Sequence, residues 1–206
     1  MNKVNPFLYQ NIDNSNHWII SEIILNQCKQ HPNNKIIQFV DGPEWSFDDL
    51  KNIAFEKAKT LRDLSINQGD TVTVMVDDPV DFIPYWVASS FLGVMFVALN
   101  TALKGSVLLH QIRLANSNVI IVSDVYYEDV AQLVQENKSK IKVLNCSKLK
   151  STGMILEKDV YHGKISDEVC TMFTSGTSGP SKGVLMPNAH CVLFAVGTIE
   201  NYKLNH

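Results

Sequence analysis

The chain of 206 residues is 45% hydrophobic and 19% charged, with a formal net charge of −3 at pH 7. This composition is typical of a globular domain with a substantial core, and its mildly acidic balance excludes a basic surface for nucleic acid. The four cysteines Cys28, Cys146, Cys170 and Cys191 stand far apart without a C-x-x-C pair. They predict reduced thiols in a cytoplasmic protein and argue against a catalytic cysteine.

The sequence predicts neither a secretory signal nor a membrane span. The first ten residues contain no apolar segment of the kind that a signal peptide needs. Residues 82–103 carry no charged side chain and are numerous enough to span a bilayer. However, Pro84 and Gly93 interrupt this run, and we interpret it as a buried helix followed by a buried strand.

In chain order, hydrophobic periodicity predicts helices over residues 17–31, 46–64, 79–92, 106–116, 124–137 and 188–201. It predicts strands over residues 35–40, 44–47, 71–76, 94–99, 119–122, 141–145 and 168–173. Ser46 with Asp49 marks one helix start, Asp78 before Pro79 marks another, and residues 147–167 are irregular and polar. The alternation predicts an α/β fold with mainly parallel sheet units covered by helices.

A loop of glycines, hydroxyl side chains and one lysine follows the strand predicted over 168–173. Three glycines allow sharp turns and a close approach of the backbone to a ligand, while Lys182 adds a compact positive charge. Backbone amides, small hydroxyl donors and one cation suit a polyphosphate. The alternative is a flexible Gly/Ser linker. The strand before the loop and the lysine within it favour the phosphate site.

Two familiar phosphate loops are excluded by spacing. A Walker A loop needs glycine before its lysine and Ser or Thr after it, but Ser181 precedes Lys182 and Gly183 follows it. A dinucleotide fingerprint needs G-x-G-x-x-G, whereas the glycines here fall as G-x-x-G-x-x-x-G.

The stretch closely resembles the signature T-S-G-T-[TS]-G-x-P-K-G-V of the adenylate-forming (AMP-dependent synthetase/ligase) superfamily. Residues 174–179 and 182–184 stand on its fixed positions, while the proline falls one place early, at Pro180. Residues 69–72 are similar to the G-D-x-V of these enzymes, and residues 100–105 to a stretch of acyl-CoA and carnitine-type CoA ligases. The resemblance extends over roughly residues 17–200.

This resemblance implies an ATP-dependent acid–CoA ligase, in which a carboxylate and ATP form an acyl-adenylate and pyrophosphate, and coenzyme A then takes the acyl group. It implies Mg²⁺ as a cofactor of the complete enzyme and a small-molecule carboxylic acid as substrate. The implied phosphate contacts are Thr174, Ser175, Gly176, Thr177, Ser178 and Lys182, with Gly179 and Gly183 shaping the turn. The family's His-x-Asn is reversed here as Asn188 and His190, so we predict a helix-start or core role for His190.

The resemblance also implies that much of the enzyme lies beyond His206. The segments for adenine, metal and ribose, the acid pocket and the C-terminal domain with its catalytic lysine come later in the family. We therefore expect residues 1–206 to be an incomplete N-terminal AMP-binding domain without catalytic or metal-binding residues of its own, inactive alone. The apolar strands at 94–99 and 119–122 would then lack part of their cover and favour association with the missing part or self-association. A non-catalytic nucleotide-binding module and an inactive remnant remain alternatives.

Overall fold

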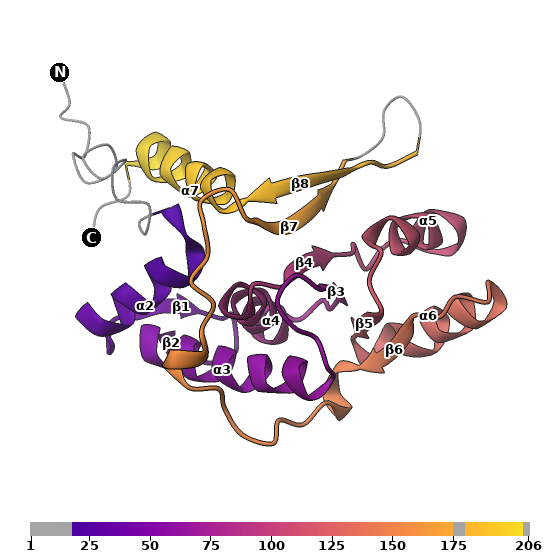
Figure 1. The fold of residues 1–206 in the computed structure, drawn as a ribbon, viewed down its shortest axis with the longest axis horizontal. Helices are drawn as coiled ribbons and strands as arrows, with labels where there is room; N and C mark the ends of the chain where they lie inside the picture. Colours follow the sequence, from indigo (N-terminus) through magenta and orange to yellow (C-terminus); the bar gives the residue numbers. More distant parts are fainter. Residues whose placement is uncertain (1–17, 175–179, 204–206) are drawn as a thin grey trace.

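The computed structural model describes residues 18–174 and 180–203, and its central element is a mainly parallel β-sheet (Figure 1). Among these residues six strands follow the order β6-β5-β3-β4-β7-β8. Their bounds are β3 Thr71–Met75, β4 Met95–Ala98, β5 Val119–Val122, β6 Lys142–Asn145, β7 Glu168–Phe173 and β8 Gly183–Pro187. The first five pair in parallel, and β8 pairs with β7 in antiparallel. The predicted α/β fold with a mainly parallel sheet is confirmed.

Helices cover both faces of this sheet (Figure 1). Alternate side chains of a strand point to opposite faces, and accordingly Val72 and Val74 of β3 lie in one apolar cluster while Met75 lies in the other. The first cluster includes α3 and α4, and the second includes α5 and α6. The helix bounds are α2 Ile20–Gln30, α3 Phe47–Asp63, α4 Pro79–Leu92, α5 Gly105–Ala115, α6 Asp124–Glu136 and α7 Asn188–Tyr202. A separate hairpin pairs β1 Lys35–Gln38 with β2 Glu44–Ser46.

The predicted helix starts are confirmed in atomic detail. The Ser46 hydroxyl accepts from the Asp49 amide at 3.1 Å, and the Asp49 carboxylate accepts from the Ser46 amide at 2.8 Å. This reciprocal pair satisfies two backbone donors that the first turn of α3 leaves free. The Asp78 carboxylate accepts from the Val80 amide at 2.8 Å and starts α4 in the same way. The run 82–103 divides into α4 and β4 as predicted, and no helix of the described part is long and apolar enough to cross a membrane.

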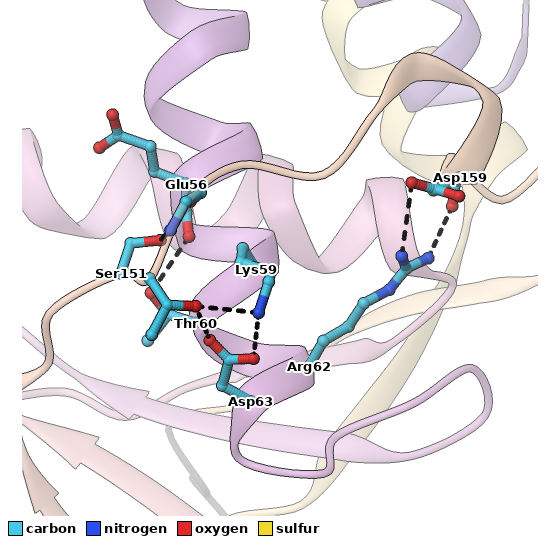
Figure 2. A network of polar contacts seen from close by, with 9 residues as sticks. Glu56, Lys59, Thr60, Arg62, Asp63, Ser151 and Asp159 are labelled. Carbon is cyan, nitrogen blue, oxygen red and sulfur yellow. Dashed lines mark hydrogen bonds and ion pairs between the residues drawn. The ribbon is translucent and has the colours of Figure 1, made fainter.

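The irregular segment between β6 and β7 lies along α3 (Figure 1) and is held there by polar contacts (Figure 2). Lys59 Nζ donates to Thr152 Oγ1 at 2.9 Å, and that hydroxyl donates to the Asp63 carboxylate at 2.7 Å. The Arg62 guanidinium donates to the Asp159 carbonyl at 2.8 Å. The segment contains 3₁₀ turns at Cys146–Lys148 and Glu157–Asp159. These contacts hold the segment against α3 before the chain enters β7, which lies between β4 and β8.

The expected location of exposed apolar surface was wrong. Ile120 and Ile121 of β5 are fully buried, because α3–α4 and α5–α6 within this chain already cover both faces of the strand. Large apolar side chains are instead exposed on the last elements of the described chain. They are Met172 of β7, Val184 and Leu185 of β8, and Leu193 and Phe194 of α7. Part of the exposed apolar surface therefore lies on β7, β8 and α7.

Gly93 ends α4 at a position that admits no side chain. It adopts a left-handed conformation with φ +64°, and an added Cβ would lie 2.5 Å from Cδ1 of Tyr161. The Tyr161 ring has little freedom to move aside, because its amide donates to the Phe91 carbonyl at 2.7 Å and its hydroxyl donates to Asp167 at 2.9 Å. Gly69 has φ +85° with nothing within 4 Å of the added Cβ.

Gly93→Ala should therefore destabilise the protein more than Gly69→Ala, which is a matched control for left-handed strain. We expect Gly69→Ala to lower the free energy of unfolding by about 1 kcal/mol. Gly93→Ala should lower it by roughly 1–3 kcal/mol more, because of the clash with the ring. Urea denaturation measures both variants. Equal losses would show that the Tyr161 contact does not restrict this position.

Candidate functional site

The predicted phosphate loop connects β7 to β8 in an antiparallel hairpin. Phe173 pairs with Gly183 at the end of the ladder, and the Thr174 amide donates to the Lys182 carbonyl at 2.9 Å. The Lys182 amide lies 3.4 Å from Thr174 Oγ1. The sequence predicted β7 with its observed bounds but did not identify residues 183–187 as a strand. The antiparallel partner brings the two ends of the loop side by side.

Of the predicted phosphate contacts, Thr174, Lys182 and Gly183 lie in the described residues and come together at the base of the loop. The side chains of Thr174 and Lys182 are exposed. Ser175, Gly176, Thr177, Ser178 and Gly179 lie outside the described residues. The loop begins at the carboxyl end of β7, which neighbours the parallel strand β4. The carboxyl edge of a parallel sheet is where α/β folds bind their ligands.

Helix α5 supports the returning end of the loop through Ser181. The Gln111 side-chain amide donates to Ser181 Oγ at 3.1 Å, and this hydroxyl donates to the Thr174 carbonyl at 2.8 Å. His110 Nε2 lies 2.9 Å from the Ser181 carbonyl oxygen, which can only accept, so Nε2 carries the proton. Gln111 is buried, and a buried amide requires such a partner.

Sequence reasoning did not identify His110 and Gln111 as residues of this site. They lie about 70 residues before Ser181 in the sequence, on a helix whose pattern indicates only an amphipathic face. A polar glutamine within the buried stretch of α5 was the available signal. Ser181 occupies the position of the signature's usual proline, and its hydroxyl makes both of the contacts that a proline could not make.

The same edge of the sheet carries a second polar group, centred on Asp77. Asp77 follows β3, and its carboxylate accepts from the Ser123 hydroxyl at 2.7 Å and from the Tyr126 hydroxyl at 3.3 Å. The hydrogen bond from Ser123 lowers the pKa of Asp77 below its ordinary value, so the group is ionised at neutral pH. At the end of β4, the Asn100 side chain accepts from the Ala102 amide at 2.9 Å and forms a turn.

Asn188 and His190 have unequal roles at the start of α7. Asn188 is buried, and its side chain accepts from the Ile20 amide at 3.1 Å and donates to the Lys164 carbonyl at 3.1 Å. His190 lies in the first turn, so its predicted helix-start position is confirmed. Its side chain is exposed and stacks on Phe194 with ring centroids 5.4 Å apart, which contradicts the alternative of a core histidine.

The described residues contain no group of three or more His, Cys, Asp or Glu side chains that could hold a metal ion. What the described residues assemble is the base of the loop, where exposed Thr174 and Lys182 are joined by the hairpin and Ser181 is supported by α5. Such an arrangement can bind a phosphate anion through backbone amides, hydroxyls and one cation.

Comparison with known proteins finds a matching family model and similar CoA ligases. The family model described as AMP-binding enzyme matches residues 24–205. The 2-succinylbenzoate–CoA ligase of Oceanobacillus iheyensis is 28% identical over 170 residues, which are 82% of this chain and 33% of the relative. The 4-coumarate–CoA ligase of Vanilla planifolia is 24% identical over an alignment that spans 78% of this chain and 31% of the relative.

The fold has close counterparts among solved structures. The O-succinylbenzoate coenzyme A synthetase of Bacillus subtilis, in complex with AMP, superposes with a TM-score of 0.76 at 19% identity. The match covers 88% of this chain and 46% of that structure. The chain spans about a third of the length of the curated relatives it matches.

Ser181→Ala should loosen the base of the loop, because it removes the hydroxyl that joins Gln111 to the Thr174 carbonyl. With about 1 kcal/mol for a hydrogen bond of this kind, local opening should increase about fivefold. Limited trypsin digestion measures this directly as the rate of cleavage after Lys182. Ser151→Ala is the matched control, since its hydroxyl contacts Gly153. An unchanged cleavage rate in Ser181→Ala would show that α5 does not support the loop.

Proposed function

The chain belongs to the AMP-binding family of adenylate-forming enzymes, and on that premise we propose that it is the N-terminal part of an ATP-dependent acid–CoA ligase. The observation that carries the proposal is the hairpin loop with Thr174 and Lys182 at its base, at the carboxyl edge of the sheet. In the proposed reaction a substrate carboxylate attacks the α-phosphate of ATP and releases pyrophosphate. The thiol of coenzyme A then takes the acyl group from the acyl-adenylate and releases AMP.

In this proposal the loop binds the phosphates of ATP. The contacts are assigned to Thr174, Ser175, Gly176, Thr177, Ser178 and Lys182, while Gly179 and Gly183 shape the turn. The backbone contacts between Thr174 and Lys182 support this assignment, because they bring the residue with the hydroxyl and the residue with the cation together at the base of the loop. Their contribution is positioning and electrostatic stabilisation of phosphate charge, with no covalent step.

The substrate that we propose is a small carboxylic acid. The relatives named above are ligases for 2-succinylbenzoate and 4-coumarate, both carboxylates, and this shared chemistry supports the class. Mg²⁺ would belong to the complete enzyme. The described residues form no cluster of three or more His, Cys, Asp or Glu side chains, and we assign the ion no ligand among them.

We further propose that residues 1–206 form an incomplete AMP-binding domain, which needs additional polypeptide for turnover. The match to about a third of the relatives' length supports this view. So does the exposed apolar surface on β7, β8 and α7, since apolar surface at a sheet edge is suited to a partner segment. The partner would be the remaining part of the same enzyme.

Lys182→Ala should weaken ATP binding by the 206-residue chain. We expect the chain to bind ATP weakly, with a dissociation constant in about the high-micromolar range or above, because loop amides bind phosphate locally. Loss of a charged hydrogen bond should raise this constant about tenfold or more. Isothermal titration calorimetry at low ionic strength measures it. Lys158→Ala, which alters an exposed lysine in a different element, is the charge-matched control and should bind like wild type.

The chain alone should support no acid-dependent ATP–pyrophosphate exchange and no thioester formation, even with 2-succinylbenzoate or 4-coumarate present. Catalysis by positioning fails when most positioning groups are absent. Exchange of labelled pyrophosphate into ATP, run with a panel of carboxylic acids, measures this. Turnover with any acid would contradict the incomplete-domain proposal. ATP binding without turnover, both alone and with a supplied downstream segment of a relative, would favour the non-catalytic module.

A further inference from the structure

Two cysteine thiols from different elements lie next to each other beside the loop hairpin. Cys170 is in the middle of β7 and Cys191 is in the first turn of α7. Their Sγ atoms are 3.8 Å apart, although the residues are 21 positions apart in the sequence. Both side chains are half-buried, so that small reagents can reach them.

The backbone around this pair is held in a defined frame. The β7–β8 ladder pairs Cys170 with Met186, and α7 begins immediately after β8. The Asn188 amide donates to the Asp167 carbonyl at 3.0 Å, and the Ala189 amide donates to the Ile165 carbonyl at 3.0 Å. The first turn of α7 is therefore attached to the residues that lead into β7. The short distance between the two sulfurs follows from this frame.

The contact between the two sulfurs allows either thiol to donate, and it shifts the pKa values of the two thiols in opposite directions. The hydrogen bond from the Cys170 thiol stabilises the thiolate of Cys191 and lowers the pKa of Cys191. The same bond raises the pKa of Cys170, and burial raises it further. A thiolate is the reactive form of cysteine, so Cys191 is suited to react first and Cys170 to react second.

We propose that Cys170 and Cys191 form a reversible disulfide, a modification site beyond the phosphate loop and independent of the proposed function. Hydrogen peroxide is the oxidant. The Cys191 thiolate attacks one peroxide oxygen, the O–O bond breaks, and the sulfenic acid of Cys191 forms as hydroxide leaves and takes up a proton. Cys170 sulfur then attacks the Cys191 sulfur, the S–O bond breaks, and the Cys170 proton leaves with that oxygen as water. Two thiols are oxidised and one peroxide is reduced to two waters.

This disulfide would close a covalent ring around the whole loop. The ring runs from residue 170 to residue 191 and contains the ends of the loop at Thr174 and Lys182. Disulfide bonding requires the sulfurs to approach from 3.8 Å to about 2.05 Å. Oxidation then fixes α7 to β7, and reduction by a dithiol releases it.

The other two cysteines provide internal controls. Cys28 and Cys146 are buried, and burial raises the pKa of each thiol, that of Cys146 to about 11. The Cys28 thiol is 3.3 Å from the Phe47 carbonyl and points to the backbone. Low thiolate content and burial predict that both stay reduced under the conditions that oxidise the pair.

Peptide mapping of the folded full-length chain tests the proposal. After mild hydrogen peroxide and alkylation of remaining thiols, trypsin should release one peptide covering residues 165–182 joined to one covering residues 183–203. The joined species should be lighter by two hydrogen atoms than its separate parts, and a dithiol reductant should remove it. Cys170→Ser and Cys191→Ser should each abolish it, while Cys28 and Cys146 remain alkylated in wild type.

A second measurement on the wild-type chain does not depend on the variants folding. Oxidation should raise the midpoint of thermal unfolding by roughly 5 °C, because the closed ring restricts the unfolded chain. Phenylarsine oxide, which needs two adjacent thiols, should bind the reduced chain with a stoichiometry of about one molecule per chain. It should also block the reaction with peroxide. Linkage of either thiol to Cys28 or Cys146, or oxidation to sulfinic acid without the joined peptide, would overturn the proposal.

Discussion

The pairing of β8 with β7 is the constraint on which the candidate site depends. A loop rich in glycine loses much conformational entropy when it is ordered. The antiparallel ladder fixes the loop's two ends at Thr174 and Lys182 and thereby removes part of that cost before a ligand arrives. β7 is in turn held by β4, a strand buried between helices of this chain. The sheet thus fixes the positions of the two residues at which the loop begins and ends, Thr174 and Lys182.

The hydrogen bond from α5 to Ser181 explains how the loop accommodates serine at the position where the signature has proline. A proline before the lysine would restrict the backbone through its ring, whereas Ser181 restricts the same position through hydrogen bonds to Gln111 and Thr174. Moving the proline to position 180 keeps one rigid residue in the returning segment. The chain therefore reaches a defined loop end by side-chain bonding to a neighbouring helix, which makes the position of α5 relevant to phosphate binding.

Much of the fold could be predicted because its strands and helices have strong local signals. The helix at 79–92, with Asp78 before it, Pro79 as its first residue and Gly93 after it, was predicted with its observed bounds, as were β5 and β7. β8 could not be identified, because exposed Val184 and Leu185 follow no clear alternation and the partner strand defines the pairing. His110 and Gln111 were missed since their contacts join segments distant in sequence. The residues of the motif are neighbours in the sequence, whereas the residues that hydrogen-bond to it come from a distant helix.

Contacts near the amino end of β7 and in its middle link this strand to α7. At its amino end, Asn188 joins α7, α2 and the segment before β7 through three hydrogen bonds. At its carboxyl end, Thr174 begins the loop. Between these ends lies Cys170, next to Cys191 of α7. A change in the position of α7 would therefore act on the strand that carries the loop, since β7 and α7 share both the Asn188 contacts and the cysteine pair. Asn188 stands where the family's His-x-Asn has its histidine, and its buried side chain joins α7 to α2 and to the segment before β7.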